Sequence, residues 1–195
     1  ARGLDETRLA SQASAIRQAN IAIDGIEILH GTEVDIRPDG TLDYPNKVLD
    51  SLNWVSAAVH SGFRQSSEDM TKRIIAAINN PYVDAIAHPT GRILNGRNAY
   101  SLDMDAVLHA AAATGTALEI NAMPDRLDLP AEEARKAATM GVPLVVNSDS
   151  HRVDHLTYID YGVTSARRAW LTMSDIVNTR DVEGLREWRE DRRRK

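Results

Sequence analysis

Short apolar runs alternate with amphipathic, helix-like stretches along this chain, and this alternation limits the possible folds more than any other feature. Runs typical of buried strands lie at 26–36, 54–60, 83–88, 117–121 and 143–147. Patterns typical of helices lie at 5–20, 45–52, 66–78, 103–114, 130–140, 174–178 and 181–188. Strands that alternate with helices favour a parallel sheet with helices packed outside it. We therefore predict an α/β protein with about five parallel strands, as an open sheet or as an incomplete barrel.

The composition agrees with a single soluble domain. The chain has 195 residues and contains no cysteine. Because cysteine is absent, disulfides, thiolate metal sites and cysteine nucleophiles are excluded. No apolar run approaches the roughly 20 residues that span a bilayer. These features predict a cytoplasmic protein with no membrane partner.

The charge is mildly acidic. The chain carries 23 Lys and Arg against 28 Asp and Glu, which gives a net charge of −5. A protein that binds nucleic acid over a wide surface should be basic, so any such contact is expected to be local. The basic run Arg192–Lys195 is expected to be a solvated or disordered tail.

Five potential metal ligands lie where the predicted strands end. They are Glu33, His60, His88, Asp149 and His151. Each of these side chains alone has an ordinary structural explanation, such as a solvated carboxylate or a hydrogen-bonded core imidazole. Their recurrence at strand ends is harder to ascribe to packing, because the carboxyl ends of parallel strands share one edge. Carboxylate and imidazole together suit Zn²⁺, Mn²⁺ or Fe²⁺, so the sequence predicts a metallohydrolase centre.

Neighbouring polar residues can be sorted by strand periodicity. Asp35 lies two residues after Glu33, so both side chains should share one face, whereas His30 should face the other way and pack under a helix. Glu119 is flanked by apolar residues in a central strand, so its carboxylate needs a partner there.

Arginines follow the ligand-bearing strands. They are Arg64, Arg92, Arg97 and Arg126. A guanidinium matches the geometry of a phosphate group, although each of these arginines could equally pair with a nearby acid. Their common placement predicts that they bind substrate phosphate.

These motifs together resemble the polymerase and histidinol phosphatase (PHP) domain, and most closely the PHP domain at the C-terminus of bacterial family-X DNA polymerases. The resemblance covers nearly the whole chain. The matching segments are Thr32–Asp35, Ser56–Phe63, His88–Arg92, Leu118–Ala122, Arg126–Asp128, Asn147–His151, Tyr161–Val163 and Ala166–Arg168.

The resemblance implies a distorted (β/α)7 barrel, of which this chain would form an incomplete part, with up to three Mn²⁺ or Zn²⁺ ions at the rim. By that resemblance Glu33 would bridge two ions, and His60 and His88 would bind one of them. Asp149 would bind the other bridged ion and His151 the third. Glu33, His60 and Asp149 would carry the catalysis.

The family's opening motifs, a His-x-His strand end and a later Asp-His, are missing from this sequence. We therefore expect residues 1–195 to form a single PHP-like domain that is a C-terminal fragment of a longer protein. The first two β/α units and the polymerase modules would lie in the remainder, and whether the fragment acts alone is open.

Three functions follow as hypotheses. The first is a metal-dependent phosphoesterase of a family-X DNA polymerase, acting on DNA 3′ ends as an exonuclease or 3′-phosphatase in DNA repair. The second is a stand-alone phosphatase for a small phosphomonoester such as histidinol phosphate. The third is a catalytically silent structural domain.

Overall fold

A computed structural model describes residues 3–194, and its centre is one parallel sheet. The strands are β1 (Gly31–Asp35), β2 (Trp54–Ala58), β3 (Ala85–Ile86), β4 (Ala117–Asn121) and β5 (Leu144–Asn147). They lie in the order β1-β2-β3-β4-β5, and every neighbouring pair is parallel. The predicted α/β class with five parallel strands is therefore confirmed, and the sheet is consistent with an incomplete PHP-like barrel.

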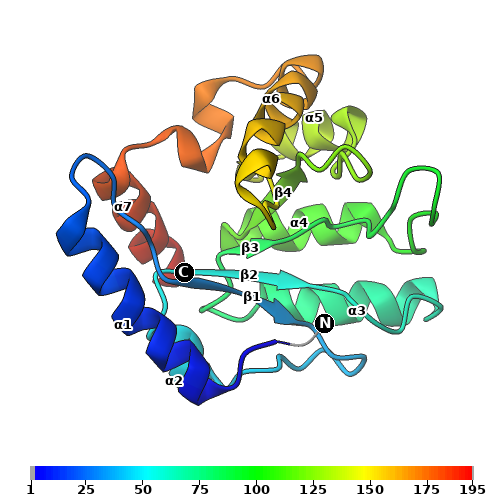
Figure 1. Cartoon of the computed structure of the whole chain (residues 1–195). Helices are drawn as coiled ribbons and strands as arrows, with labels where there is room; N and C mark the ends of the chain where they lie inside the picture. The colour runs from blue at the N-terminus through cyan, green and yellow to red at the C-terminus, as the bar shows by residue number, and fades with distance from the viewer. Residues whose placement is uncertain (1–2, 195) are drawn as a thin grey trace.

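Helices connect the strands and cover the sheet (Figure 1). The α-helices are α1 (Glu6–Ala22), α2 (Asn46–Asp50), α3 (Ser67–Ile78), α4 (Met104–Thr114), α5 (Ala131–Thr139), α6 (Ile159–Arg168) and α7 (Val182–Arg193). Three 3-10 turns, η1 (Val153–Tyr158), η2 (Met173–Asp175) and η3 (Val177–Thr179), lie in the last third of the chain. Within residues 3–194, none of the helices is both long enough and apolar enough to cross a membrane.

The first strand is shorter than predicted. The sequence suggested 26–36, but ladder pairing begins at Gly31, which lies opposite Trp54. Trp54 is the first residue of β2, so residues before Gly31 have no residue of β2 to pair with. The length of β1 is therefore set by where β2 begins rather than by the residues of β1 itself.

Two elements differ from the sequence prediction near the C-terminus. The helix expected at 174–178 is instead the pair of 3-10 turns η2 and η3, and the segment 153–168, for which no element was predicted, forms η1 and α6. Gly162 lies inside α6, and glycine has low helix propensity. A methyl group on Gly162 would approach Cγ1 of Val146 to 2.5 Å and Cβ of Ala122 to 2.9 Å, so this glycine lets α6 lie closely on β5.

Substitution of Gly162 tests this packing. Gly162→Ala is expected to lower the free energy of unfolding by roughly 1–3 kcal/mol, the usual cost of overpacking, because the contacted atoms belong to buried side chains. Urea unfolding measures the change. Gly184→Ala in α7 is the control, since the atom nearest to a methyl group there is Oδ1 of Asp181, at 3.1 Å. Equal stability of both variants would contradict the packing argument.

The arginine-rich end is not the solvated tail that the sequence suggested. Residues up to Arg193 belong to α7, and Arg192 is only 5% exposed. Its guanidinium pairs with the buried carboxylate of Asp84 at 3.1 Å, and Arg189 pairs with the same carboxylate at 2.9 Å. The prediction is wrong because Arg192 forms an ion pair with a residue far away in the sequence. Lys195 lies outside the described residues.

Candidate metal centre

Three of the predicted ligands meet at the carboxyl edge of the sheet. Glu33 projects from β1, and His60 and His88 follow β2 and β3. Oε1 of Glu33 lies 2.9 Å from Nε2 of His60 and 3.6 Å from Nε2 of His88. One ligand atom from each residue falls within 4.8 Å of the other two. The parallel register produces this meeting, because it carries consecutive strand ends to one rim.

Asp35 orients His60. Its carboxylate contacts Nδ1 of His60, as expected for a side chain on the same face as Glu33. Because one ring nitrogen is held by Asp35, the other points to Glu33. His30, which comes directly before β1, is buried and lies beside residues of α1 and α2, in agreement with the predicted packing under a helix.

Hydrogen bonds within the cluster shift the pKa values of Glu33 and His60 against the effect of burial. Burial acts to raise the pKa of Glu33, but hydrogen bonds from His60 and His88 bring that pKa well below its ordinary value. The hydrogen bond with Glu33 raises the pKa of His60, while burial acts against it. The site thus stabilises an ionised carboxylate beside two imidazoles.

This donor set fits a borderline divalent cation. One carboxylate and two imidazoles are the ligands that Zn²⁺, Mn²⁺ and Fe²⁺ accept. Nε2 of His60 and Nε2 of His88 both face Oε1 of Glu33, so the three donor atoms converge on one point. The residues present therefore fit a metal-binding role.

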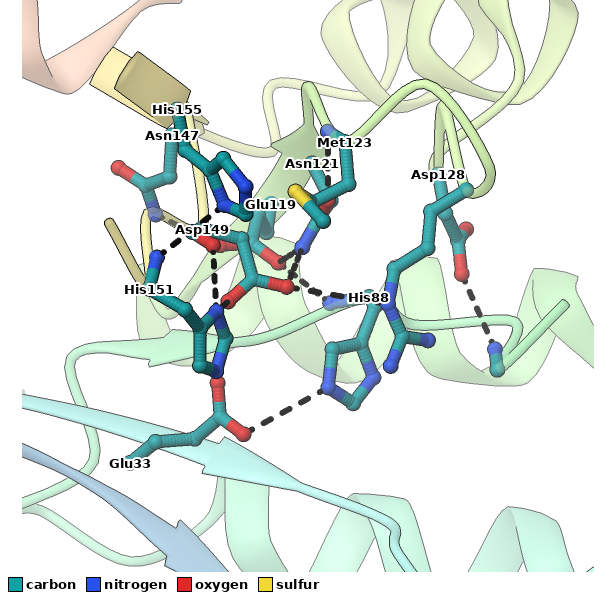
Figure 2. A network of polar contacts seen from close by, with 12 residues as sticks. Glu33, His88, Glu119, Asn121, Met123, Asp128, Asn147, Asp149, His151 and His155 are labelled. Carbon is teal, nitrogen blue, oxygen red and sulfur yellow. Dashed lines mark hydrogen bonds and ion pairs between the residues drawn. The ribbon is translucent and has the colours of Figure 1, made fainter. Parts of the chain in front are cut away.

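A second group of side chains lies at the ends of β4 and β5 (Figure 2). Oδ2 of Asp149 accepts a hydrogen bond from Nδ2 of Asn121 at 3.0 Å. His151 is more exposed, and its Nδ1 lies 2.9 Å from the backbone oxygen of Asp149 and 3.7 Å from that residue's Oδ1. The structure thus places Asp149 and His151 next to each other but outside the Glu33 cluster. Their roles as metal ligands remain predictions.

Buried carboxylates hold the strand ends in place. Glu119 in β4 accepts the backbone N–H of His88, and Asp128 accepts the backbone N–H groups of Thr90 and Gly91. Burial raises the pKa of Asp128, against the hydrogen bonds from Thr90 that act to lower it. These contacts fix the segment that carries His88.

The four arginines occupy different surroundings. Arg92 donates to the backbone oxygens of Arg126 and Leu127, and Arg97 donates to that of Gly91 while stacking over Phe63. Arg64 is exposed. Nε of Arg126 lies 3.8 Å from Oδ2 of Asp149, so among the four it is the arginine paired with a predicted ligand. Phosphate binding by these arginines stays a prediction.

Sequence reasoning missed the amides of the site. Asn121 and Asn147 are the last residues of β4 and β5, and both donate to the carboxylate of Glu119. The signal that found the histidines, a polar residue at the end of an apolar strand, applies equally to these two asparagines. They were overlooked because amides are poor ligands for borderline metals.

A cavity of 620 Å³ opens beside the cluster of Glu33, His60 and His88. Its lining includes Glu33, Asp35 and His60 of the site, together with Arg37 and Asp43. Its size falls within the range of small-molecule sites, about 300–1,000 Å³. The cluster is therefore reachable by a ligand.

Comparison with known proteins identifies the family. No family model matches the chain. It is 43% identical over 185 residues to the DNA polymerase/3′-5′ exonuclease PolX of Bacillus subtilis, covering 95% of the chain and 32% of that protein. It is 36% identical over 183 residues to a probable phosphatase of Thermoanaerobacter sp. (strain X514), covering 89% of the chain and 72% of that protein. A probable phosphatase of Caldanaerobacter subterraneus is 32% identical, with 89% and 69% covered.

The chain thus spans about a third of the polymerase and about 70% of the phosphatases that it matches. The matched residues include the strand ends described above. From the sequence motifs, the parallel sheet and these relatives, we conclude that the chain belongs to the PHP domain family and is related to the C-terminal domain of the family-X polymerase PolX.

Proposed function

We propose that this chain provides a metal-dependent phosphoesterase site that hydrolyses phosphoester bonds at DNA 3′ ends, as part of a PolX-like DNA-repair protein in the cytoplasm. The observation that carries the proposal is the meeting of Glu33, His60 and His88 at one edge of the sheet. The similarity to a polymerase named as a 3′-5′ exonuclease supports DNA as the substrate.

In this proposal Glu33, His60 and His88 hold divalent cations, Mn²⁺ or Zn²⁺, with Asp149 and His151 as further ligands. Bound cations of this kind lower the pKa of a water and neutralise phosphate charge. Asp35 keeps Nε2 of His60 directed at the site. In this proposal a His or Asp side chain at the rim that binds no cation takes the proton that the water releases.

The arginines complete the proposed substrate site. Arg126 lies beside Asp149, so its guanidinium can face a phosphate bound at that edge. Arg92 and Arg97 already donate to backbone oxygens, so in this proposal they use their remaining N–H groups toward phosphate. Arg64, which is exposed after β2, would contact the substrate farther from the metal cluster.

A small phosphomonoester is the second candidate substrate. The relatives that the chain covers most completely are named probable phosphatases, and this favours a small substrate. A third candidate is a silent structural domain. It is favoured by the direct contact between Glu33 and His60, which satisfies both groups as an ion pair.

A substrate panel with metal removal separates the three candidates. The full-length protein is treated with a chelator and assayed on a 3′-phosphorylated oligonucleotide, an unmodified oligonucleotide and histidinol phosphate. Chelation is expected to reduce hydrolysis to the background rate because the cation supplies the charge stabilisation, and Mn²⁺ or Zn²⁺ should restore it. Faster turnover of histidinol phosphate than of both oligonucleotides contradicts the DNA assignment. Absence of bound metal by elemental analysis, with no hydrolysis, supports the silent domain.

A further inference from the structure

We infer that Glu119, acting with Asn121, is a positioning residue that holds the two halves of the candidate centre in register. One half is the Glu33, His60 and His88 cluster, and the other is Asp149 with His151. The inference rests on the proposed function, since it takes the Glu33 cluster to be the metal site. It concerns a residue that touches neither metal nor substrate in that proposal.

Glu119 is a buried carboxylate in the middle of the sheet, where it must be fully hydrogen-bonded. It is 4% exposed, and every residue of β4 is buried. An unpaired carboxylate in such surroundings is strongly unfavourable. Its partners are three N–H donors located at the ends of three different strands. They are the backbone N–H of His88 (2.7 Å), Nδ2 of Asn121 (3.1 Å) and Nδ2 of Asn147 (2.8 Å).

The bond to His88 fixes a conformation that the residue would not adopt freely. His88 has φ of +32°, outside the regions that non-glycine residues prefer. Its backbone N–H points at Oε2 of Glu119, while its Nε2 lies 3.6 Å from Glu33. Figure 2 shows both contacts of His88. Glu119 therefore holds the peptide whose turn directs the imidazole toward the cluster.

Asn121 extends the same restraint to Asp149. The backbone N–H of Met123 donates to Oδ1 of Asn121 at 3.0 Å, and this fixes which end of the amide is the NH₂ group. That NH₂ then donates to Glu119 at 3.1 Å and to Asp149 at 3.0 Å. The amide thus joins two carboxylates, one buried behind His88 and one at the end of β5. A shift of Glu119 would move both halves of the site.

The chemistry of the network requires acceptors on both arms of residue 119. Oε1 accepts from Asn147, and Oε2 accepts from His88 and Asn121. Glutamine has nearly the same shape but carries an NH₂ on one arm. With that NH₂ turned toward Asn147, the remaining carbonyl still accepts from His88 and Asn121, so Glu119→Gln loses only the Asn147 contact. Glu119→Leu has a similar volume but no acceptor atom, so it breaks all three contacts.

The decisive measurement is Mn²⁺ binding to the full-length protein without substrate, by calorimetry. Glu119→Leu is expected to weaken binding at this centre about 10- to 100-fold, the usual effect of changing a group that orients a metal ligand. A Glu33→Gln variant identifies which part of the isotherm belongs to this centre. Asn147→Ala and Glu119→Gln, which both leave the His88 bond intact, are expected to weaken binding less than Glu119→Leu.

Asp84→Asn is the matched control. Asp84 is also a buried carboxylate that accepts a backbone N–H, that of Val55, but it lies before β3 rather than after it. It is expected to lower the melting temperature without changing Mn²⁺ affinity. If Glu119→Leu keeps the original affinity, or if Asp84→Asn weakens binding as much, Glu119 is only a stabilising residue. Because no substrate is present, a wrong substrate assignment leaves this result unaffected. If Glu33→Gln binds Mn²⁺ as tightly as the original protein, the proposed metal site itself is refuted.

Discussion

Replacing Glu33 with glutamine is expected to reduce hydrolysis at least about a thousandfold, which corresponds to roughly 4 kcal/mol of lost transition-state stabilisation. Glu33 contacts both histidines of the cluster, and hydrogen bonds from them hold its pKa below the ordinary value, so it provides the ionised carboxylate of the site. Glutamine keeps the shape but removes that charge. The rate is measured in the full-length protein on the preferred substrate from the panel.

Two controls make the Glu33 result specific. Glu68→Gln changes an exposed carboxylate of α3 that pairs only with Lys72 among the ion pairs of residues 3–194, and it should hydrolyse substrate at the original rate. In the proposed PolX-like protein, nucleotide addition should also be unchanged. Hydrolysis by Glu33→Gln within about threefold of the original rate, a difference below 1 kcal/mol, would overturn the assignment of the site.

Replacing Asp84 with alanine is expected to lower the free energy of unfolding by about 3–5 kcal/mol, the usual effect of removing one partner of a buried ion pair. Asp84 is completely buried, and its carboxylate accepts from Arg189 (2.9 Å), Arg192 (3.1 Å) and the backbone N–H of Val55 (2.9 Å). Burial lowers the pKa of Arg192, and the charge of Asp84 opposes that shift. Without Asp84, two guanidinium groups of α7 would remain desolvated against the sheet.

Urea unfolding measures the Asp84 effect. Asp191→Ala is a suitable control, because Asp191 pairs with Arg194 on the exposed side of α7. Loss of an exposed pair costs less than about 1 kcal/mol. Comparable stability losses in the two variants would show that the contact between α7 and the strand starts contributes little. Figure 1 shows α7 beside the beginnings of β1 and β2, the end of the sheet away from the candidate centre.

The rim of the sheet could be predicted because its signal is local. Each strand is an apolar run that ends in a polar side chain, and parallel strands bring those ends to one edge. This reasoning put five side chains in one centre, and the structure brings Glu33, His60 and His88 together with Asp35 beside them. Asp149 and His151 are not part of that group, since spacing within one strand carries no information about separation across several strands. That any of the five binds a metal stays a prediction.

The segments that were missed depend on contacts distant in sequence. Helix α6 contains Gly162, which lowers helix propensity, yet close packing on Val146 and Ala122 requires a residue without a side chain there. The local sequence predicts that Arg192 belongs to a charged tail. In the structure it pairs with Asp84, which lies more than a hundred positions earlier. In both cases the energy that decides the structure comes from a partner that local sequence patterns do not reveal.

The sequence alone determined the order of the five strands and of helices α1 to α5, the parallel sheet and the identity of the side chains at its carboxyl edge. It could do so because alternating apolar periodicity and strand-end polarity are recorded in consecutive residues. Only the tertiary structure decided which of those side chains touch, how Glu119 joins His88 to Asn121 and Asn147, and where α7 is anchored. These outcomes depend on burial: a carboxylate removed from water must find its donors wherever the folded chain brings them.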